Sequence, residues 1–256
     1  DVAKYLPKWK DPVVVSKFNE ADASFETRPA KRAITIRHLL THTSGIGYGF
    51  SSPTLAKIME KTKKNELDSP LLFDPGESWA YGASTRVLGH VVEAISGQKI
   101  DEFLQARILG PLGMNDTSYL VPTTKYSRVV AVNARNAGGT FEERPMPATL
   151  PATVQGDGGL YGTASDYGLF LRMLLNRGTL NGKRILSEQS AKLMLEPATG
   201  SVVVKEQQSS NLALSKNFPV GAGNDKWGLG FQLAAEKLPN RRSPGSGTWA
   251  GIFNTH

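Results

Sequence analysis

Cysteine is absent from this sequence of 256 residues. Its absence excludes disulfide bonds, a cysteine nucleophile and thiolate zinc sites, although it does not identify a cellular compartment. Long apolar runs are also missing, since no stretch approaches the roughly 18 residues that suggest a membrane span. The first ten residues, DVAKYLPKWK, have no apolar signal-peptide core. We therefore expect no stable membrane insertion.

A concentrated charge of one sign is missing as well. The chain has 30 lysines and arginines against 23 acidic residues, a net charge of +7, but its densest basic groups are only the pairs Lys63-Lys64 and Arg241-Arg242. Proteins that bind nucleic acids gather such residues into a stripe or patch. The charge therefore indicates a solvated surface and no nucleic-acid partner.

Five helices are predicted from apolar residues at helical spacing. A capping residue begins most of them, and a glycine often ends them. They are expected to begin at Thr35, at Ser84 or Thr85, near residue 101, at Thr163 or Ser165, and at Ser187. Four of them are expected to end by Gly45, Gly97, Gly110 and Gly178.

Strand patterns are fewer and come mostly late in the chain. The candidates are 129–132, 202–204, 229–233 and 248–253, whereas prolines in residues 1–34 predict irregular structure there. This order predicts an α+β fold in one domain over 1–256. A mainly helical subdomain would cover about 35–200, and a sheet portion about 201–256.

Two histidines have metal-ligand spacing. His38 and His42 lie four residues apart in a predicted helix, but Leu39 stands where the H-E-x-x-H motif has its glutamate, and no third ligand follows nearby. We therefore interpret both as helix-surface or capping groups and predict no metal and no cofactor. A G-x-S-x-G nucleophile elbow is also absent, which argues against an α/β-hydrolase.

Five blocks in order carry a family resemblance. They are ITIRHLLTHTSGIGYG (34–49), DPGESWAYGASTRVLGHVVEAISG (74–97), LGPLGMNDTSY (109–119), GDGGLYGTASDYGLFLRMLLNRG (156–178) and GSGTWAGIF (245–253). Together they strongly resemble the β-lactamase-related serine hydrolases, which include class C β-lactamases, D-alanyl-D-alanine peptidases and bacterial family VIII carboxylesterases. The resemblance implies an antiparallel sheet flanked by helices plus a helical subdomain. It leaves the bacterial periplasm and the cytoplasm both open.

The family acts through an S-x-x-K motif, a tyrosine element and a K-T-G-like strand. Tyr81 matches the tyrosine, which the resemblance implies is the general base, while its alternative is a buried core tyrosine. Trp249 and Gly251 match a W-x-G variant of the strand, and the backbone N–H of Ile252 would be an oxyanion donor. Trp249 offers an apolar wall where a cation would bind a substrate carboxylate, which favours neutral esters.

Other positions contribute less to this interpretation. Ala83 stands where lactamases have an asparagine, which also weakens the β-lactamase assignment. Tyr48 and Asp157 are candidates for lining a substrate pocket.

No S-x-x-K motif precedes the HLLTHTSG block, which is where the family has it. Thr54-Leu55-Ala56-Lys57 imitates it, but lies after the HLLTHTSG block instead of before it, so we interpret it as a helix-surface pair. We expect the 256 residues to be an internal segment interrupted at both ends, with the serine and lysine upstream. A pseudoenzyme that has lost its nucleophile is the alternative.

These observations predict a serine hydrolase that cleaves short-chain carboxylic esters through an acyl-enzyme, with a small-molecule ester or amide as its substrate. The alternatives are a β-lactamase or D-alanyl-D-alanine peptidase, and a non-catalytic module that binds cell-wall peptides. The sequence does not indicate an oligomeric state.

Overall fold

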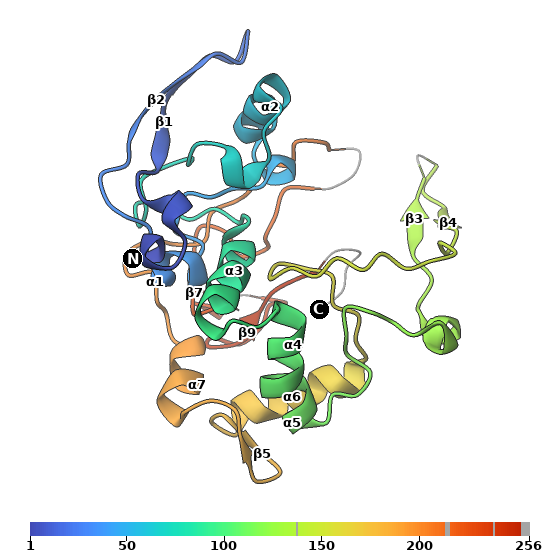
Figure 1. Cartoon of the computed structure of the whole chain (residues 1–256). Coiled ribbons are helices and arrows are strands. Elements are labelled where there is room, and N and C mark those ends of the chain that lie inside the picture. Colours follow the sequence, from blue (N-terminus) through green and yellow to red (C-terminus); the bar gives the residue numbers. More distant parts are fainter. Residues whose placement is uncertain (137, 213–215, 238, 252–256) are drawn as a thin grey trace.

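The computed structural model describes residues 1–136, 138–212, 216–237 and 239–251 (Figure 1). Helices and short antiparallel strands are mixed along the chain, which confirms the α+β prediction. The helices are α1 Ile36–Leu40, α2 Pro53–Thr62, α3 Ser84–Ser96, α4 Ile100–Leu104, α5 Gly110–Leu112, α6 Ala164–Leu175 and α7 Glu188–Met194. A π-helical turn, Gln105–Leu109, joins α4 to α5. Short 3-10 turns cover Val2–Lys4, Pro7–Trp9, Gly49–Ser51, Glu66–Asp68 and Thr123–Arg128.

The predicted helix caps are confirmed at four positions. Thr35 Oγ1 accepts from the backbone N–H of His38, and Thr163 and Ser187 cap α6 and α7 in the same way. Gly97 ends α3 with a φ of 70°, a left-handed conformation that glycine adopts without a Cβ penalty. The helix predicted from about residue 101 continues past Gly110 instead of ending there, because the π-helical turn passes directly into α5.

The prediction that the first 34 residues are mostly irregular is wrong at two segments. Strands β1 Val13–Phe18 and β2 Phe25–Pro29 form an antiparallel hairpin in that region, with Val13 opposite Pro29 and Phe18 opposite Phe25. Three consecutive valines favour extended structure. Pro12 and Pro29 lie at the margins of the hairpin, where a missing backbone donor is tolerated.

The late strands are shorter than predicted. Three two-residue strands form one antiparallel sheet in the order β7–β8–β9, with bounds Lys226–Trp227, Gln232–Leu233 and Gly247–Thr248. Residues 129–132 and 202–204 form no strand, although Val204 is fully buried and its backbone bonds to the loop at Gly223 and Asp225. The apolar residues at 202–204 thus reflect burial of the chain, and they resemble a strand pattern although no regular strand pairs with them. Two further pairs complete the strands: β3 Asn133–Arg135 with β4 Phe141–Glu143, and β5 Thr179–Leu180 with β6 Lys183–Arg184.

The hydrophobic core is divided among three clusters. The first joins the N-terminal segment to α1 and α3 and includes Val14, Leu39 and Val87. The second joins the π-helical turn, α5 and α6. The third surrounds the buried indoles of Trp79 and Trp227, each 1% exposed, and lies where the candidate site residues meet. No helix of the described residues is both long and apolar enough to cross a membrane.

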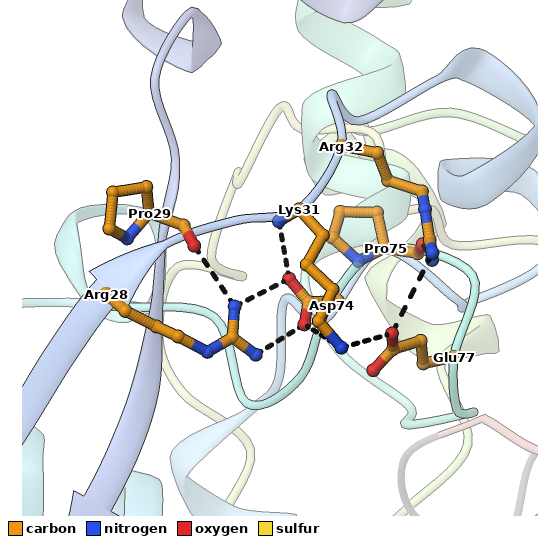
Figure 2. Close-up of polar contacts among 7 residues, drawn as sticks. All are labelled: Arg28, Pro29, Lys31, Arg32, Asp74, Pro75 and Glu77. Atoms are coloured by element: carbon orange, nitrogen blue, oxygen red, sulfur yellow. Dashed lines mark hydrogen bonds and ion pairs between the residues drawn. The ribbon is translucent and has the colours of Figure 1, made fainter.

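A buried aspartate anchors the loop that leads to the candidate site (Figure 2). Asp74 is completely buried and accepts hydrogen bonds from the Arg28 guanidinium of β2 and from the backbone N–H of Lys31 at 2.7 Å. The adjacent Pro75 carbonyl accepts from Arg32 Nη1 at 2.7 Å. The hydrogen bond from Arg28 is the main reason that the pKa of Asp74 lies far below its usual range.

The Asp74→Asn variant should unfold at a temperature several degrees lower than the wild type at pH 7. The carboxylate has a lower pKa in the folded protein than the unfolded value of about 3.9, so its stabilisation is present above that pH and is lost as the pH falls further. The difference between variant and wild type should therefore shrink below about pH 4. Thermal unfolding followed by circular dichroism at pH 7 and pH 3 measures both effects.

Asp68→Asn is the matched control, because Asp68 is 45% exposed and forms its ion pair, within the described part of the chain, with the exposed Lys8. Its effect at pH 7 should stay within about 0.5 kcal/mol. Equal effects of the two substitutions would show that Asp74 is not the anchor of this loop.

Candidate active site

The backbone on both sides of Tyr81 is held at fixed positions. Ala80 donates from its N–H to the His42 carbonyl at 3.0 Å, and Tyr81 donates to Gln207 Oε1 at 3.1 Å. Gly82 lies so close to the chain at Ile46 that a Cβ there would be 1.9 Å from the Ile46 carbonyl oxygen. Helix α3 begins two residues later. Tyr81 is thus placed by contacts from two separate segments, the loop at residues 42–47 and Gln207.

Aromatic rings surround Tyr81. The distances from its ring centroid are 4.8 Å to Trp249, 5.1 Å to His42, 5.2 Å to Tyr48, 6.0 Å to Phe218 and 6.4 Å to Phe50. Phe50 remains 51% exposed. Its ring stacks between Tyr48 and Phe218, with interplanar angles of 22° and 19°. This arrangement forms an apolar aromatic wall beside Tyr81 that is partly open to solvent.

Trp249 lies directly after β9, just past the end of the strand. Its ring packs against Trp227 at 4.7 Å and against Trp79 at 6.1 Å. The indole Nε1 of Trp249 is buried and makes no hydrogen bond of normal geometry with the described residues. Gly251 is exposed, and Ile252 lies outside the described residues, so its role as an oxyanion donor stays a prediction.

His42 is not the helix-surface or capping group that we expected. It follows α1 with a φ of 52°, is 2% exposed and contacts the rings of Tyr81 and Trp227. Burial lowers its pKa to about 3, so the imidazole is neutral at physiological pH.

His38 is indeed a capping group, because its Nδ1 accepts from the backbone N–H of Thr35. The described residues contain no group of three side chains able to hold a metal ion.

Tyr81 is a neutral phenol in this environment. Burial raises the pKa of Tyr81, the Trp249 indole beside it lowers that pKa by a smaller amount, and the charge of Asp157 raises it. A phenolate at neutral pH therefore requires a cation close to the hydroxyl. The lysine that the family resemblance places upstream would supply that charge.

Tyr48 and Asp157 come together, although 109 residues separate them. The Tyr48 hydroxyl donates to the Asp157 carboxylate, and Arg86 of α3 donates to the same carboxylate from Nε at 3.0 Å. Arg86 also lies 3.7 Å from Glu66. The structure thus brings both predicted pocket residues close to Tyr81, and it adds Arg86, which sequence reasoning missed.

The imitation of S-x-x-K lies elsewhere. Thr54 and Lys57 are both on α2, and Lys57 pairs with the exposed Glu20. A paired surface lysine agrees with the interpretation of these residues as a helix-surface pair.

Comparison with known proteins shows which family the chain matches. The Beta-lactamase family model matches residues 1–256. Protein Rv1367c of Mycobacterium tuberculosis is 31% identical over 90% of this chain and 60% of its own length. Lovastatin esterase of Penicillium rubens is 28% identical over 98% of this chain and 67% of its own length.

A solved structure shows the same fold. The LovD9 mutant of simvastatin synthase from Aspergillus terreus superposes with a TM-score of 0.77 and 29% identity, covering 98% of this chain and 65% of that one. The present chain thus spans about three fifths of the length of Rv1367c and slightly less than two thirds of the synthase. The chain belongs to the Beta-lactamase family and has the β-lactamase/transpeptidase-like fold.

Proposed function

We propose that this protein is a serine hydrolase that cleaves small, neutral carboxylic esters through an acyl-enzyme. Tyr81 is the general base, and the nucleophilic serine and its lysine belong to an S-x-x-K motif upstream of residue 1. The observation that carries the proposal is the contact between the Tyr81 and Trp249 rings, at 4.8 Å. It supports the proposal because the two residues match, by resemblance, two of the three elements through which the family acts.

The surroundings of Tyr81 support a neutral substrate. Trp249 occupies the position at which β-lactamases and peptidases carry a cation, and an indole cannot pair with a substrate carboxylate. The wall of Phe50, Tyr48 and Phe218 adds apolar surface on another side. An uncharged ester loses less hydration on entering such a site than an anionic β-lactam does.

The proposed reaction uses a proton cycle at Tyr81. With a lysine ammonium beside it, the phenolate takes the serine proton while the serine oxygen attacks the ester carbonyl. The phenol then protonates the departing alcohol, and water hydrolyses the acyl-enzyme in a second proton cycle. Transfer of the acyl group to another alcohol instead of water is a second candidate activity, which the likeness to monacolin J acid methylbutanoyltransferase of Aspergillus terreus favours.

A substrate panel tests the proposal on the full-length protein. We expect turnover of p-nitrophenyl acetate and butyrate at least about 100-fold faster, in kcat/KM, than turnover of a chromogenic cephalosporin or a D-alanyl-D-alanine peptide. Added short alcohols would reveal transfer by forming a new ester. A preference for the cephalosporin or the peptide would refute the proposed substrate class.

A fluorophosphonate probe tests the nucleophile separately. It should label the full-length protein at a serine upstream of residue 1 and leave the isolated 256-residue chain unlabelled, because no S-x-x-K precedes the HLLTHTSG block in that chain. Absence of labelling in the full-length protein would favour the non-catalytic alternative.

A further inference from the structure

A buried carboxylate lies at the hydroxyl of Tyr48. The Asp157 side chain is only 2% exposed, and it accepts two hydrogen bonds from Arg86 Nε, at 3.1 and 3.0 Å, in addition to the one from the Tyr48 hydroxyl. The Arg86 Nη2 lies 3.0 Å from the same group. A carboxylate enclosed in this way has little surface left for a substrate, so its function must be exerted through the residues that it holds.

The loop that carries Asp157 rests directly on α3. A Cβ added at Gly156 would lie 2.3 Å from the Thr85 carbonyl oxygen and 3.0 Å from the Cα of Gly89. Only two glycines allow this approach of backbone to backbone. Because α3 begins just after Tyr81, the contact fixes the carboxylate relative to Tyr81 through a rigid helix.

Tyr48 connects the carboxylate to Tyr81. Its hydroxyl donates to Asp157, while its ring meets the Tyr81 ring nearly edge-on, at 5.2 Å and 61°. Tyr48 is 6% exposed, and burial followed by the Asp157 bond raises its pKa so far that it remains a neutral donor. The ring of Tyr48 is therefore held at its hydroxyl end by Asp157.

We propose that Asp157 is a positioning residue for Tyr81, acting through the hydroxyl of Tyr48 while Arg86 balances its charge. The proposal rests on the function proposed above, in which Tyr81 is the general base. It replaces the expectation that Asp157 lines the substrate pocket. A base that is displaced by about 1 Å loses much of its effectiveness, which is why a residue without substrate contact can influence the chemical step.

The charge of Asp157 offers a way to observe this role. Among the described residues, the titratable groups facing Tyr81 are His42, Tyr48 and Asp157. His42 and Tyr48 are neutral at physiological pH, so Asp157 supplies the negative charge that opposes ionisation of the Tyr81 phenol. Removing that charge with Asp157→Asn should move the ionisation of Tyr81 to lower pH.

The test compares Asp157→Asn, Asp157→Ala and Tyr48→Phe in the full-length protein. Asparagine keeps an oxygen that can accept from Tyr48, so it should retain most of kcat, whereas Asp157→Ala and Tyr48→Phe should each lower kcat about tenfold with KM changed less than about threefold. The acid limb of the pH–rate profile should move to lower pH in Asp157→Asn. These changes in kcat would not come from a residue that binds substrate, because loss of such a contact raises KM.

A second measurement does not depend on turnover. Incorporation of 3-fluorotyrosine lowers phenol pKa values and gives every tyrosine, including the seven of residues 1–256, a 19F resonance. The Tyr81→Phe variant assigns the Tyr81 resonance, and its titration should shift to lower pH in Asp157→Asn. If the wild type and all variants prove inactive toward esters while the Tyr81 titration still shifts in Asp157→Asn, that result would refute the proposed function but keep the link between Asp157 and Tyr81.

Two outcomes would overturn the proposal. An unchanged Tyr81 titration in Asp157→Asn would show that the two residues are not coupled. A rise in KM at constant kcat would make Asp157 a substrate contact. If Asp157→Ala fails to fold because Arg86 loses its partner, the shape-conserving Asp157→Asn and Tyr48→Phe variants still decide between these outcomes.

Discussion

Replacing Gly82 by alanine should destabilise the protein by about 3 kcal/mol or more. The added Cβ would lie 1.9 Å from the Ile46 carbonyl oxygen and 2.6 Å from the Cα of Gly47. Both are backbone atoms of a loop that is itself buried, so no side-chain rotation can relieve the overlap. Either the segment at Ile46 or the one that carries Tyr81 must move.

Chemical denaturation followed by circular dichroism measures this effect, and Gly168→Ala is the matched control. Gly168 lies within α6, and a Cβ there would meet nothing within 4 Å. Alanine at that position should stabilise the protein by about 0.5–1 kcal/mol, because glycine is unfavourable inside a helix. A Gly82→Ala variant as stable as the wild type would mean that the loops at residues 46 and 82 are farther apart than described.

The Tyr81→Phe variant should lower the rate of acylation by a factor of about 10²–10⁴. Phenylalanine keeps the ring that packs against Trp249, His42 and Tyr48, so the fold should persist. It removes the hydroxyl that would exchange protons with the serine and with the leaving alcohol. Stopped-flow measurement of the acylation burst with a p-nitrophenyl ester reports this step directly.

Tyr167→Phe provides the control for Tyr81→Phe. Tyr167 is a tyrosine of α6 that is 39% exposed and stacks on Phe170. Its substitution should leave both the burst and the steady-state rate unchanged. Near-wild-type acylation by the Tyr81→Phe variant would contradict the role of Tyr81 as general base and favour its being a core tyrosine.

The parts of the fold that could be predicted were those determined locally. Thr35, Thr163 and Ser187 cap their helices through bonds to residues three positions later, so a short sequence window contains the whole interaction. The hairpin of β1 and β2 was missed because its stability depends on pairing between strands. The prolines at its margins were interpreted as breakers, although only a proline inside a central strand removes a needed donor.

The candidate site divides in the same way. Tyr81 and Trp249 could be proposed because each lies in a block of sequence that resembles a family. Phe50 and Phe218 carried no local pattern, and the spacing of His42 from His38 did not indicate its place beside Tyr81, since an aromatic wall is assembled only when distant segments meet. Arg86 was missed for the same reason, because its partner Asp157 is 71 residues away.

The clustering of indoles at the site makes the protein's own fluorescence a local probe. Three of its four tryptophans, Trp79, Trp227 and Trp249, have rings within 6.1 Å of one another, measured between centroids. The fourth, Trp9, belongs to the separate N-terminal cluster. Tryptophan dominates absorption at the red edge of the protein spectrum, so most of the light absorbed there by this chain excites indoles close to Tyr81. Tryptophan emission should therefore change more when a ligand binds beside Tyr81 than when the conformation changes elsewhere in the molecule.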